Sequence, residues 1–325
     1  MSEFKLTTVE EFEAATARLL ETGAKVGADS WQMRVKNQTP HCKFGEQGVC
    51  CRICSMGPCR ITPKAPRGIC GCDVHGIVGR NFLRFTAGGA ATHSDHGREI
   101  CITLGHAKEG GDYQVKDPEK LIRIAKEWGV ETEGKDIYDL AHEMSDLAQE
   151  EYGKIRGISR WLKRAPQHTQ DLWHAAGIEP RAIDREVSCA LHMTHMGNTS
   201  KPEALIRQAL RNGLSDGWGG SMCGTEFSDV LFGTPKPIDT EANLGVMNAE
   251  NVNIVVHGHD PSLSEMICEY ADSKEMIDYA KSMGAKGITV SGVCCTSNEV
   301  AMRRGIPMAG NFLQQENVVL TGACE

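Results

Sequence analysis

The residues best suited to chemistry in this chain are cysteines, and seven of its 14 cysteines lie between residues 41 and 72. Four of them, Cys51, Cys54, Cys59 and Cys70, follow the spacing C-x2-C-x4-C-x10-C. Four thiolates from one loop can close a tetrahedral ligand set, which suits either zinc or a [4Fe–4S] cluster. Zinc modules usually present two short knuckles, and only the first half of this stretch resembles one. The spacing therefore favours an iron–sulfur cluster over zinc.

Two further cysteines of this stretch, Cys42 and Cys50, have a different pattern. Cys50 is the direct neighbour of Cys51, and neighbouring side chains in extended backbone lie on opposite faces, so the two thiols can serve different centres. Two thiolates are half of a tetrahedral set, and a twofold axis would supply the other half. We therefore expect Cys42 and Cys50 to bind a cluster shared between two subunits, with a free thiol pair as the alternative. Cys72 is an alternative to Cys70 as the fourth ligand of the internal cluster.

A second set of metal-ligating residue types lies near the other end of the chain. His257 and His259 end the apolar run VNIVVHGH, and Cys294 and Cys295 follow the run GITVSGV. Short apolar runs of this kind are typical of buried parallel strands. Because ligands of open parallel sheets bind at the carboxyl ends of the strands, the two pairs can meet in space. This arrangement indicates the start of a metal site.

The elements that must position these residues are of two kinds. Residues 118–190 show amphipathic helical periodicity, and residues 252–322 alternate short apolar runs with helical segments. We expect an α + α/β protein, with a helical iron–sulfur domain at residues 1–240 and the start of a Rossmann-like domain at residues 241–325. The third strand of its βαβαβ unit is predicted at residues 317–322. Gly88 and Gly89, in a buried helix, would let another element approach closely.

Composition excludes several classes of protein. The chain has 325 residues, 40% of them hydrophobic and 24% charged, which is typical of a globular protein. No apolar run approaches the roughly 20 residues of a membrane span, and no export signal begins the chain, so we expect a cytoplasmic protein. Its cysteines are then more often metal ligands than disulfides. The net charge of −8 argues against nucleic acid as a partner.

Several motifs together resemble one family across residues 30–325. They are PHCKFGEQGVCCRICSMGPCRI, GICG, THSDHGR, LSDGWGG, LFGTP, NVNIVVHGHDP and VCCTSNEV. These motifs resemble the nickel–iron carbon monoxide dehydrogenases. The resemblance implies a homodimer, with a helical domain followed by two Rossmann-like domains in each subunit. It also implies the reversible reaction of CO with water to give CO2, two protons and two electrons, with the electrons passing to a ferredoxin-like carrier. An acetyl-CoA synthase is a possible further partner.

The resemblance also implies roles for the metal-ligating residues. The bridging cluster, [4Fe–4S] or [2Fe–2S], matches the first pair of cysteines, and the [4Fe–4S] relay matches the four-cysteine set. The family's Gly-x-Cys-Gly turn favours Cys70 over Cys72. The exposed iron of the Ni-Fe-S active-site cluster takes a histidine and a cysteine, which correspond to His259 and Cys295, with His257 and Cys294 as alternates.

Proton transfer is implied for a second group of residues. His93 and His96 match the start of a histidine ladder, and imidazoles one helical turn apart can pass a proton directly or through water. The next rung here is Glu99 rather than histidine. Asp216 is a candidate base near the iron, with helix capping as its alternative. Two polar helix residues without a proton role are the alternative for His93 and His96.

One departure and two competing functions accompany this resemblance. The chain ends at Glu325, before several ligands that the family's active cluster requires, so we expect it to be part of a longer protein. A hybrid-cluster hydroxylamine reductase shares the fold, but its cysteine spacing differs and it lacks the Cys42 and Cys50 pair. A non-catalytic iron–sulfur electron carrier or redox sensor is the third interpretation.

Overall fold

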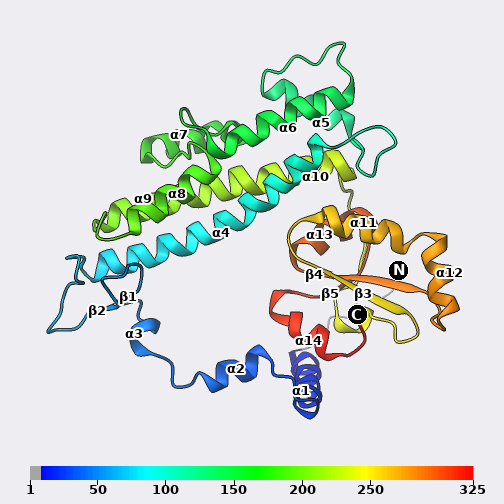
Figure 1. Cartoon of the computed structure of the whole chain (residues 1–325), viewed down its shortest axis with the longest axis horizontal. Coiled ribbons are helices and arrows are strands. Elements are labelled where there is room, and N and C mark those ends of the chain that lie inside the picture. Colours follow the sequence, from blue (N-terminus) through cyan, green and yellow to red (C-terminus); the bar gives the residue numbers. More distant parts are fainter. Residues whose placement is uncertain (1–8, 325) are drawn as a thin grey trace. The chain divides into compact units, whose positions relative to one another are not determined.

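The computed structural model describes residues 9–324 and divides the chain into two units (Figure 1). Residues 41–234 form one unit, which we call the helical unit. The described parts of residues 1–40 and 235–325 form the other, which we call the sheet unit. The α + α/β fold class predicted from the sequence is confirmed. The division differs from the expected one, 1–240 and 241–325, because residues 9–40 belong with the sheet.

The helical unit contains most of the helices and a small hairpin. Its elements are α3 Lys43–Glu46, β1 Cys50–Cys51, β2 Cys59–Arg60, α4 Val74–Gly105, α5 Pro118–Glu127, α6 Ile137–Gly153, the 3-10 helix η1 Arg160–Arg164, α7 Gln167–Ala176, α8 Ile183–Thr194, α9 Pro202–Ser215, the π-helical turn η2 Asp216–Gly220 and α10 Ser221–Phe232. The strands β1 and β2 are antiparallel, with Cys51 opposite Cys59.

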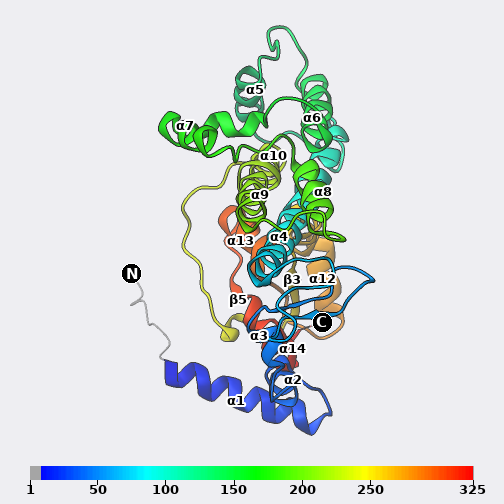
Figure 2. The same ribbon diagram turned by 90° about the vertical axis from the view of Figure 1, so that its left-hand side faces the viewer.

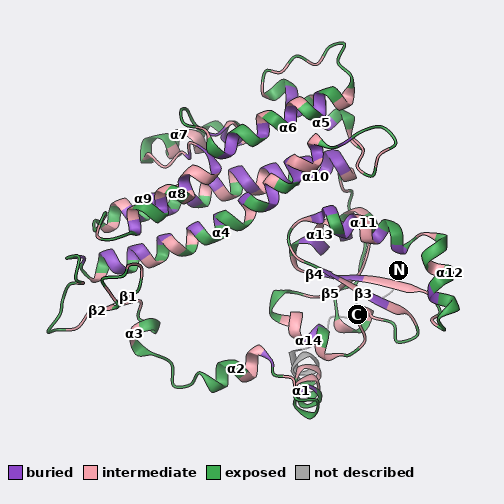
Figure 3. Ribbon diagram, viewed as in Figure 1, coloured by how far each residue is buried: buried purple, intermediate pink, exposed green. Residues whose placement is uncertain are grey.

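The long helix α4 is the axis of this unit. Asp73 begins it by accepting a hydrogen bond from the backbone N–H of Gly76, at 2.9 Å, which is the usual role of aspartate at an N-cap. Helices α6, α8, α9 and α10 pack along α4, and Figure 2 shows α4, α8 and α9 side by side. Ile100 and Leu104 of α4 belong to a core that also holds Trp161 and Phe227. Figure 3 shows buried segments along α4 and its neighbour α10.

The close approach to α4 occurs at different glycines from the expected ones. An added Cβ at Gly88 would meet nothing within 4 Å, and one at Gly89 would only touch Asp216, at 4.0 Å. At Gly97 it would lie 2.6 Å from the carbonyl oxygen of Gly220, so the backbones of α4 and η2 cross there. The expectation for Gly88 and Gly89 was wrong because those two glycines lie on the exposed side of α4.

The sheet unit has three parallel strands in the order β3-β4-β5. The strands are β3 Val252–His257, β4 Ile288–Val293 and β5 Met308–Gly310. Its helices are α1 Val9–Lys25, α2 Trp31–Asn37, η3 Leu244–Val246, α11 Pro261–Ala271, α12 Lys274–Ser282, α13 Cys294–Arg304, η4 Phe312–Gln314 and α14 Gln315–Leu320. Residues 9–324 contain no helix with both the length and the apolarity that a membrane crossing requires.

The third strand predicted at residues 317–322 was wrong. That segment is the helix α14, and the third strand is the shorter β5. A short apolar run has no periodicity that separates a strand from a buried helical turn. Val318 is buried against Val293 and Ala309, whereas its neighbour Val319 is 69% exposed. Only one side of this turn therefore reaches the core.

The N-terminal segment belongs with the sheet because it packs on α14. The backbone N–H of Trp31 donates to Glu316 Oε2 at 2.6 Å, and the indole Nε1 of Trp31 donates to the carbonyl oxygen of Leu313 at 2.9 Å. Arg34 forms an ion pair with the same carboxylate of Glu316. These contacts join segments about 280 residues apart in the sequence.

Candidate metal centres

The four thiols with relay spacing surround one cavity of the helical unit. Pairing of β1 with β2 places Cys51 opposite Cys59, the turn between the strands carries Cys54, and the following loop brings Cys70 back. The rest of the cavity wall is mostly apolar and contains no carboxylate; it consists of Ile53, Met56, Gly57, Gly68, Ile69, Ile77, Arg80, Thr194 and Met196. Four thiols around an apolar cavity are a donor set that fits a [4Fe–4S] cluster.

Two glycines give the loop the shape that this cavity requires. An added Cβ at Gly57 would lie 3.2 Å from both the carbonyl oxygen of Cys51 and the backbone nitrogen of Cys59. Gly71 has a φ of +86°, a conformation that other residues rarely adopt. The backbone can therefore turn tightly between Cys51 and Cys59, and again directly after Cys70.

Two N–H groups donate hydrogen bonds to sulfur at this cavity. The backbone N–H of Ile69 donates to Cys59 Sγ, and Arg80 Nη1 donates to Cys70 Sγ, both at 3.4 Å. Burial raises the pKa of Cys70, but the hydrogen bond and charge of Arg80, together with the backbone N–H groups of Cys72 and Cys70, outweigh it, so the net pKa lies below the ordinary thiol value. Because the thiolate is the metal-binding form, Arg80 favours Cys70 as a ligand.

Cys72 has a different environment from Cys70. It is fully buried, and it does not belong to the cavity wall. Its thiol packs directly against Gly76 at the start of α4, and burial raises its pKa. Cys72 thus has the surroundings of a core residue, and Cys70 those of a cavity-lining residue.

Cys42 and Cys50 lie near this cavity in the sequence but face other surroundings. Cys42 precedes α3 and is exposed, and Cys50 lies half-buried in β1 beside Cys51. The extended backbone of β1 places neighbouring side chains on opposite faces. Asn81 of α4 anchors this strand by donating to the carbonyl oxygen of Cys50 at 3.1 Å. The shared cluster remains a prediction, because it requires a second subunit.

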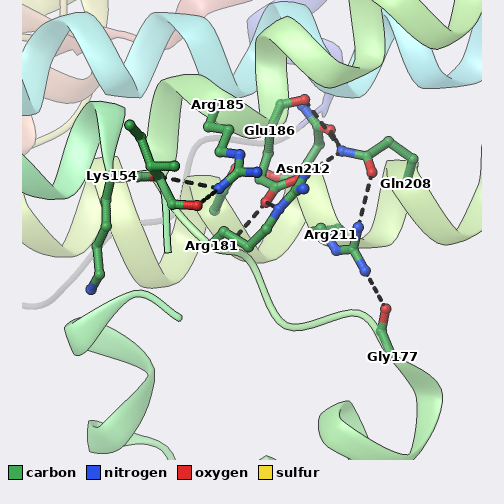
Figure 4. A network of polar contacts seen from close by, with 10 residues as sticks. Lys154, Gly177, Arg181, Arg185, Glu186, Gln208, Arg211 and Asn212 are labelled. Carbon is green, nitrogen blue, oxygen red and sulfur yellow. Dashed lines mark hydrogen bonds and ion pairs between the residues drawn. The ribbon is translucent and has the colours of Figure 1, made fainter. Parts of the chain in front are cut away.

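A buried polar network joins α8 to α9 (Figure 4). Glu186 of α8 is fully buried and accepts hydrogen bonds from Arg181, at 2.8 and 2.9 Å, and from Gln208 of α9, at 2.9 Å. Burial raises the pKa of Glu186, but these partners lower it below its ordinary value. The network thus ties α9 to α8, whose last residue, Thr194, lines the cavity.

The two ligand pairs of the sheet unit meet at the carboxyl edge of the strands, as the topology predicts. His257 ends β3 and Cys294 follows β4, and His257 Nε2 lies 3.5 Å from Cys294 Sγ. Thr296 joins the two loops, because its backbone N–H donates to the carbonyl oxygen of Gly258 at 2.9 Å and its hydroxyl donates to that of Asp260 at 3.0 Å.

Cys294 is one of two non-glycine residues with positive φ among residues 9–324, at +68°. Such backbone strain is frequent at functional sites. Burial raises the pKa of Cys294, and Cys295 raises it further. His259 and Cys295 are exposed at the same edge. The structure thus brings His257 and Cys294 together, whereas the family resemblance favours His259 and Cys295. Which pair binds the iron remains a prediction.

A neighbouring cavity includes one thiol that the sequence analysis left unassigned. Cys324, His257 and Val293 line it, together with residues of α14 and with Ala28 and Asp29. Arg80, which contacts the other site, was likewise not expected from the sequence. In both cases no spacing pattern marks the residue, and only the fold brings it to the cavity.

The proposed proton-transfer residues lie where α4 crosses η2. His93 Nδ1 lies 2.5 Å from Asp216 Oδ1, and the hydroxyl of Ser221 donates to that same oxygen at 3.0 Å. The hydrogen bond to Asp216 raises the pKa of His93 above its ordinary value. His96 is buried next to Gly224 of α10, and Glu99 is exposed.

These features define a class of protein, in which a helical unit with a cysteine-lined cavity accompanies a parallel sheet with His and Cys at its carboxyl edge. In the described residues, no three His, Cys, Asp or Glu side chains converge closely enough to hold a single metal ion. The profile of the Prismane/CO dehydrogenase family matches residues 49–325, and the chain belongs to this family.

Similar proteins carry names from one branch of this family. Carbon monoxide dehydrogenase 1 of Methanosarcina mazei is 46% identical over 318 residues, which are 96% of this chain and 51% of that protein. Carbon monoxide dehydrogenase 1 of Carboxydothermus hydrogenoformans is 44% identical, over 96% of this chain and 50% of that protein. The chain therefore spans about half the length of the curated relatives it matches.

Solved structures agree with this assignment. A nickel-free carbon monoxide dehydrogenase from Thermococcus sp. AM4 matches with a TM-score of 0.91 and 47% identity, over 95% of this chain and 50% of that one. An acetyl-CoA synthase/carbon monoxide dehydrogenase matches with a TM-score of 0.90 and 39% identity, over 96% of this chain and 47% of that one.

Proposed function

We propose that this chain supplies the electron relay and two active-site ligands of a nickel–iron carbon monoxide dehydrogenase. The reaction is the reversible oxidation of CO with water to CO2, two protons and two electrons. The observation that carries the proposal is the cavity lined by Cys51, Cys54, Cys59 and Cys70, in a chain of the Prismane/CO dehydrogenase family. Identities of 40–46% to five proteins named carbon monoxide dehydrogenase and to one carbon monoxide dehydrogenase/acetyl-CoA synthase subunit beta support this branch of the family.

The relay function follows from what surrounds the four thiols. A [4Fe–4S] cluster in this cavity would accept and release single electrons. The N–H groups of Ile69 and Arg80 would stabilise negative charge on two of the sulfur atoms. Cys42 and Cys50 would hold the cluster shared with a second subunit, which continues the path toward a ferredoxin-like carrier. The name of one structural neighbour supports an acetyl-CoA synthase as a possible partner.

The active-site function rests on the sheet edge. His259 and Cys295, or His257 and Cys294, would hold the iron of a Ni-Fe-S cluster, which would supply the site where CO and water react. The histidines and the nearby thiols are ligand types that iron and nickel accept. This chain carries only two ligands for that cluster, so the assignment covers part of the site.

The proton function rests on the contact between His93 and Asp216. Asp216 keeps a proton on His93 Nδ1 and orients the ring, so proton exchange falls to Nε2. Ser221 in turn orients Asp216. In this arrangement Asp216 acts through His93, which differs from the expected role of a base beside the iron.

Metal analysis combined with two assays tests the proposal. An intact subunit that contains this chain, purified without oxygen, should contain nickel and iron and should reduce viologen when CO is added. Reduction of hydroxylamine without nickel would instead indicate a hybrid-cluster reductase. Iron and sulfide with neither activity would indicate an electron carrier or redox sensor. Either outcome, hydroxylamine reduction without nickel or the absence of both activities, would contradict the proposal.

A further inference from the structure

Arg80 is a fully enclosed cation at the relay cavity. It lies in the second turn of α4, it is 2% exposed, and it is among the largest buried side chains of the described residues. Its Nε and Nη2 donate to the carbonyl oxygen of Thr199, at 2.8 and 2.5 Å. These two bonds fix the guanidinium plane, and the third nitrogen, Nη1, is directed to Cys70 Sγ at 3.4 Å.

A buried cation is costly unless a negative charge compensates it. Among residues 9–324 no aspartate or glutamate forms an ion pair with Arg80. The cavity wall contains no carboxylate either. The group at hydrogen-bonding distance that can carry negative charge is the sulfur of Cys70. The charge that balances Arg80 must therefore come from the thiolates and from whatever they bind.

We propose that Arg80 is a positioning residue that raises the reduction potential of the relay cluster. The inference rests on the proposed [4Fe–4S] cluster at the four thiols. Four thiolates around a core of charge 2+ give a net charge of −2, and one electron makes it −3. A fixed cation stabilises the form with more negative charge, so Arg80 favours the reduced cluster. Its N–H···S bond adds to this effect, because it strengthens as the sulfur gains charge.

The test is a redox titration of the anaerobically reconstituted 325-residue chain, with dithionite as reductant and electron paramagnetic resonance as readout. The signal that Cys54→Ala removes identifies the relay. In Arg80→Gln the equilibrium constant for one-electron reduction should fall about tenfold, which lowers the potential by about 59 mV. Arg80→Lys keeps the charge but loses the fixed planar donor, so its potential should lie between those of the wild type and Arg80→Gln.

Arg84→Gln is the matched control. Arg84 lies one turn further along α4 and donates to the hydroxyl of Thr194 at 2.7 Å, so its loss removes the same charge without removing a bond to sulfur. In Arg84→Gln, the equilibrium constant for one-electron reduction should stay within about threefold of the wild-type value. An Arg80→Gln potential equal to that of wild type would overturn the role of Arg80 and leave the relay intact.

Two further outcomes are also decisive. If Arg80→Gln does not hold the cluster, Arg80→Lys serves as the test, and a potential no lower than that of wild type would overturn the inference. If the wild-type chain shows no signal that depends on Cys54, the relay assignment itself fails, and the role of Arg80 fails with it. Failure of the relay is thus distinguishable from failure of the tuning.

Discussion

Asp216 Oδ1 lies 2.5 Å from Nδ1 of His93, and this contact joins the π-helical turn η2 to the middle of α4. The two residues are 123 positions apart in the sequence. The contact is possible because Gly97 and Gly220 let the two backbones cross closely. From the sequence we expected His93 in a proton ladder and Asp216 as a base near the iron, but in the structure the two residues form one hydrogen-bonded pair.

The titration of His93 should depend on Asp216. Since the carboxylate raises the pKa of His93, Asp216→Asn should lower it toward the ordinary value near 6.5. NMR titration of the His93 ring protons measures this change. The matched control is Asp95→Asn, which removes an exposed carboxylate two residues along α4 that contacts Arg98 instead. An unchanged His93 pKa in Asp216→Asn would show that the contact does not form in solution.

The same contact predicts how stability changes with pH. A histidine with a raised pKa in the folded state contributes stability that is fully present below its unfolded pKa, about 6.5, and is lost as pH rises through the folded pKa. The wild-type chain should therefore lose unfolding free energy from this pair as pH rises through that window. Urea unfolding at several pH values, with Asp216→Asn as reference, measures it. Parallel pH profiles for the two proteins would contradict the linkage.

Close packing at Gly97 should be sensitive to a single methyl group. Its added Cβ would lie 2.6 Å from the carbonyl oxygen of Gly220, so Gly97→Ala should destabilise the chain by about 1–3 kcal/mol. Gly88→Ala, on the same helix with nothing within 4 Å, should be neutral or stabilising by up to about 1 kcal/mol. Thermal unfolding compares the two. Equal midpoints would mean that η2 does not cross α4 as described.

Cys70 and Cys72 should respond differently to the same substitution. Cys70→Ala removes a thiol from the cavity wall, so the reconstituted chain should lose relay iron and sulfide. Cys72→Ala leaves the wall intact and should keep the cluster, at a stability cost of about 1–2 kcal/mol because its side chain is fully buried. Iron and sulfide analysis decides between them. Cluster loss in Cys72→Ala with retention in Cys70→Ala would reverse the assignment.

Substitutions of Cys50 and of Cys51 should likewise affect two different clusters. Cys50→Ala should weaken the cluster shared between subunits and leave the relay signal unchanged, whereas Cys51→Ala should remove the relay. Iron analysis and the sedimentation velocity of each variant report on both centres. Survival of both clusters in Cys50→Ala would show that Cys50 is not a ligand.

The sequence was most informative where spacing itself carries the chemistry. The C-x2-C-x4-C-x10-C pattern marked the four thiols that line the cavity, and the two apolar runs before His257 and Cys294 located parallel strands. In both cases local spacing determines which atoms can meet. The apolar run at residues 317–322 carries no such information, because a strand and a buried helical turn share it.

Long-range contacts of single residues could not be predicted from spacing. Arg80 reaches Cys70 only because Thr199, 119 residues away, fixes its head group. Asp216 reaches His93 only through the crossing at Gly97. Nor could the sequence show that residues 9–40 pack on α14, since the contacts of Trp31 with Leu313 and Glu316 follow no periodic pattern.

The central claim is that Cys51, Cys54, Cys59 and Cys70 hold one [4Fe–4S] cluster that carries electrons. The most direct measurement is Mössbauer spectroscopy of the anaerobically reconstituted chain, before and after reduction, in wild type and in Cys54→Ala. We expect a [4Fe–4S] component that accepts one electron in the wild type and is absent from Cys54→Ala, where only the cluster shared through Cys42 and Cys50 remains. Zinc in place of iron, or a spectrum that is the same in Cys54→Ala as in the wild type, would contradict it.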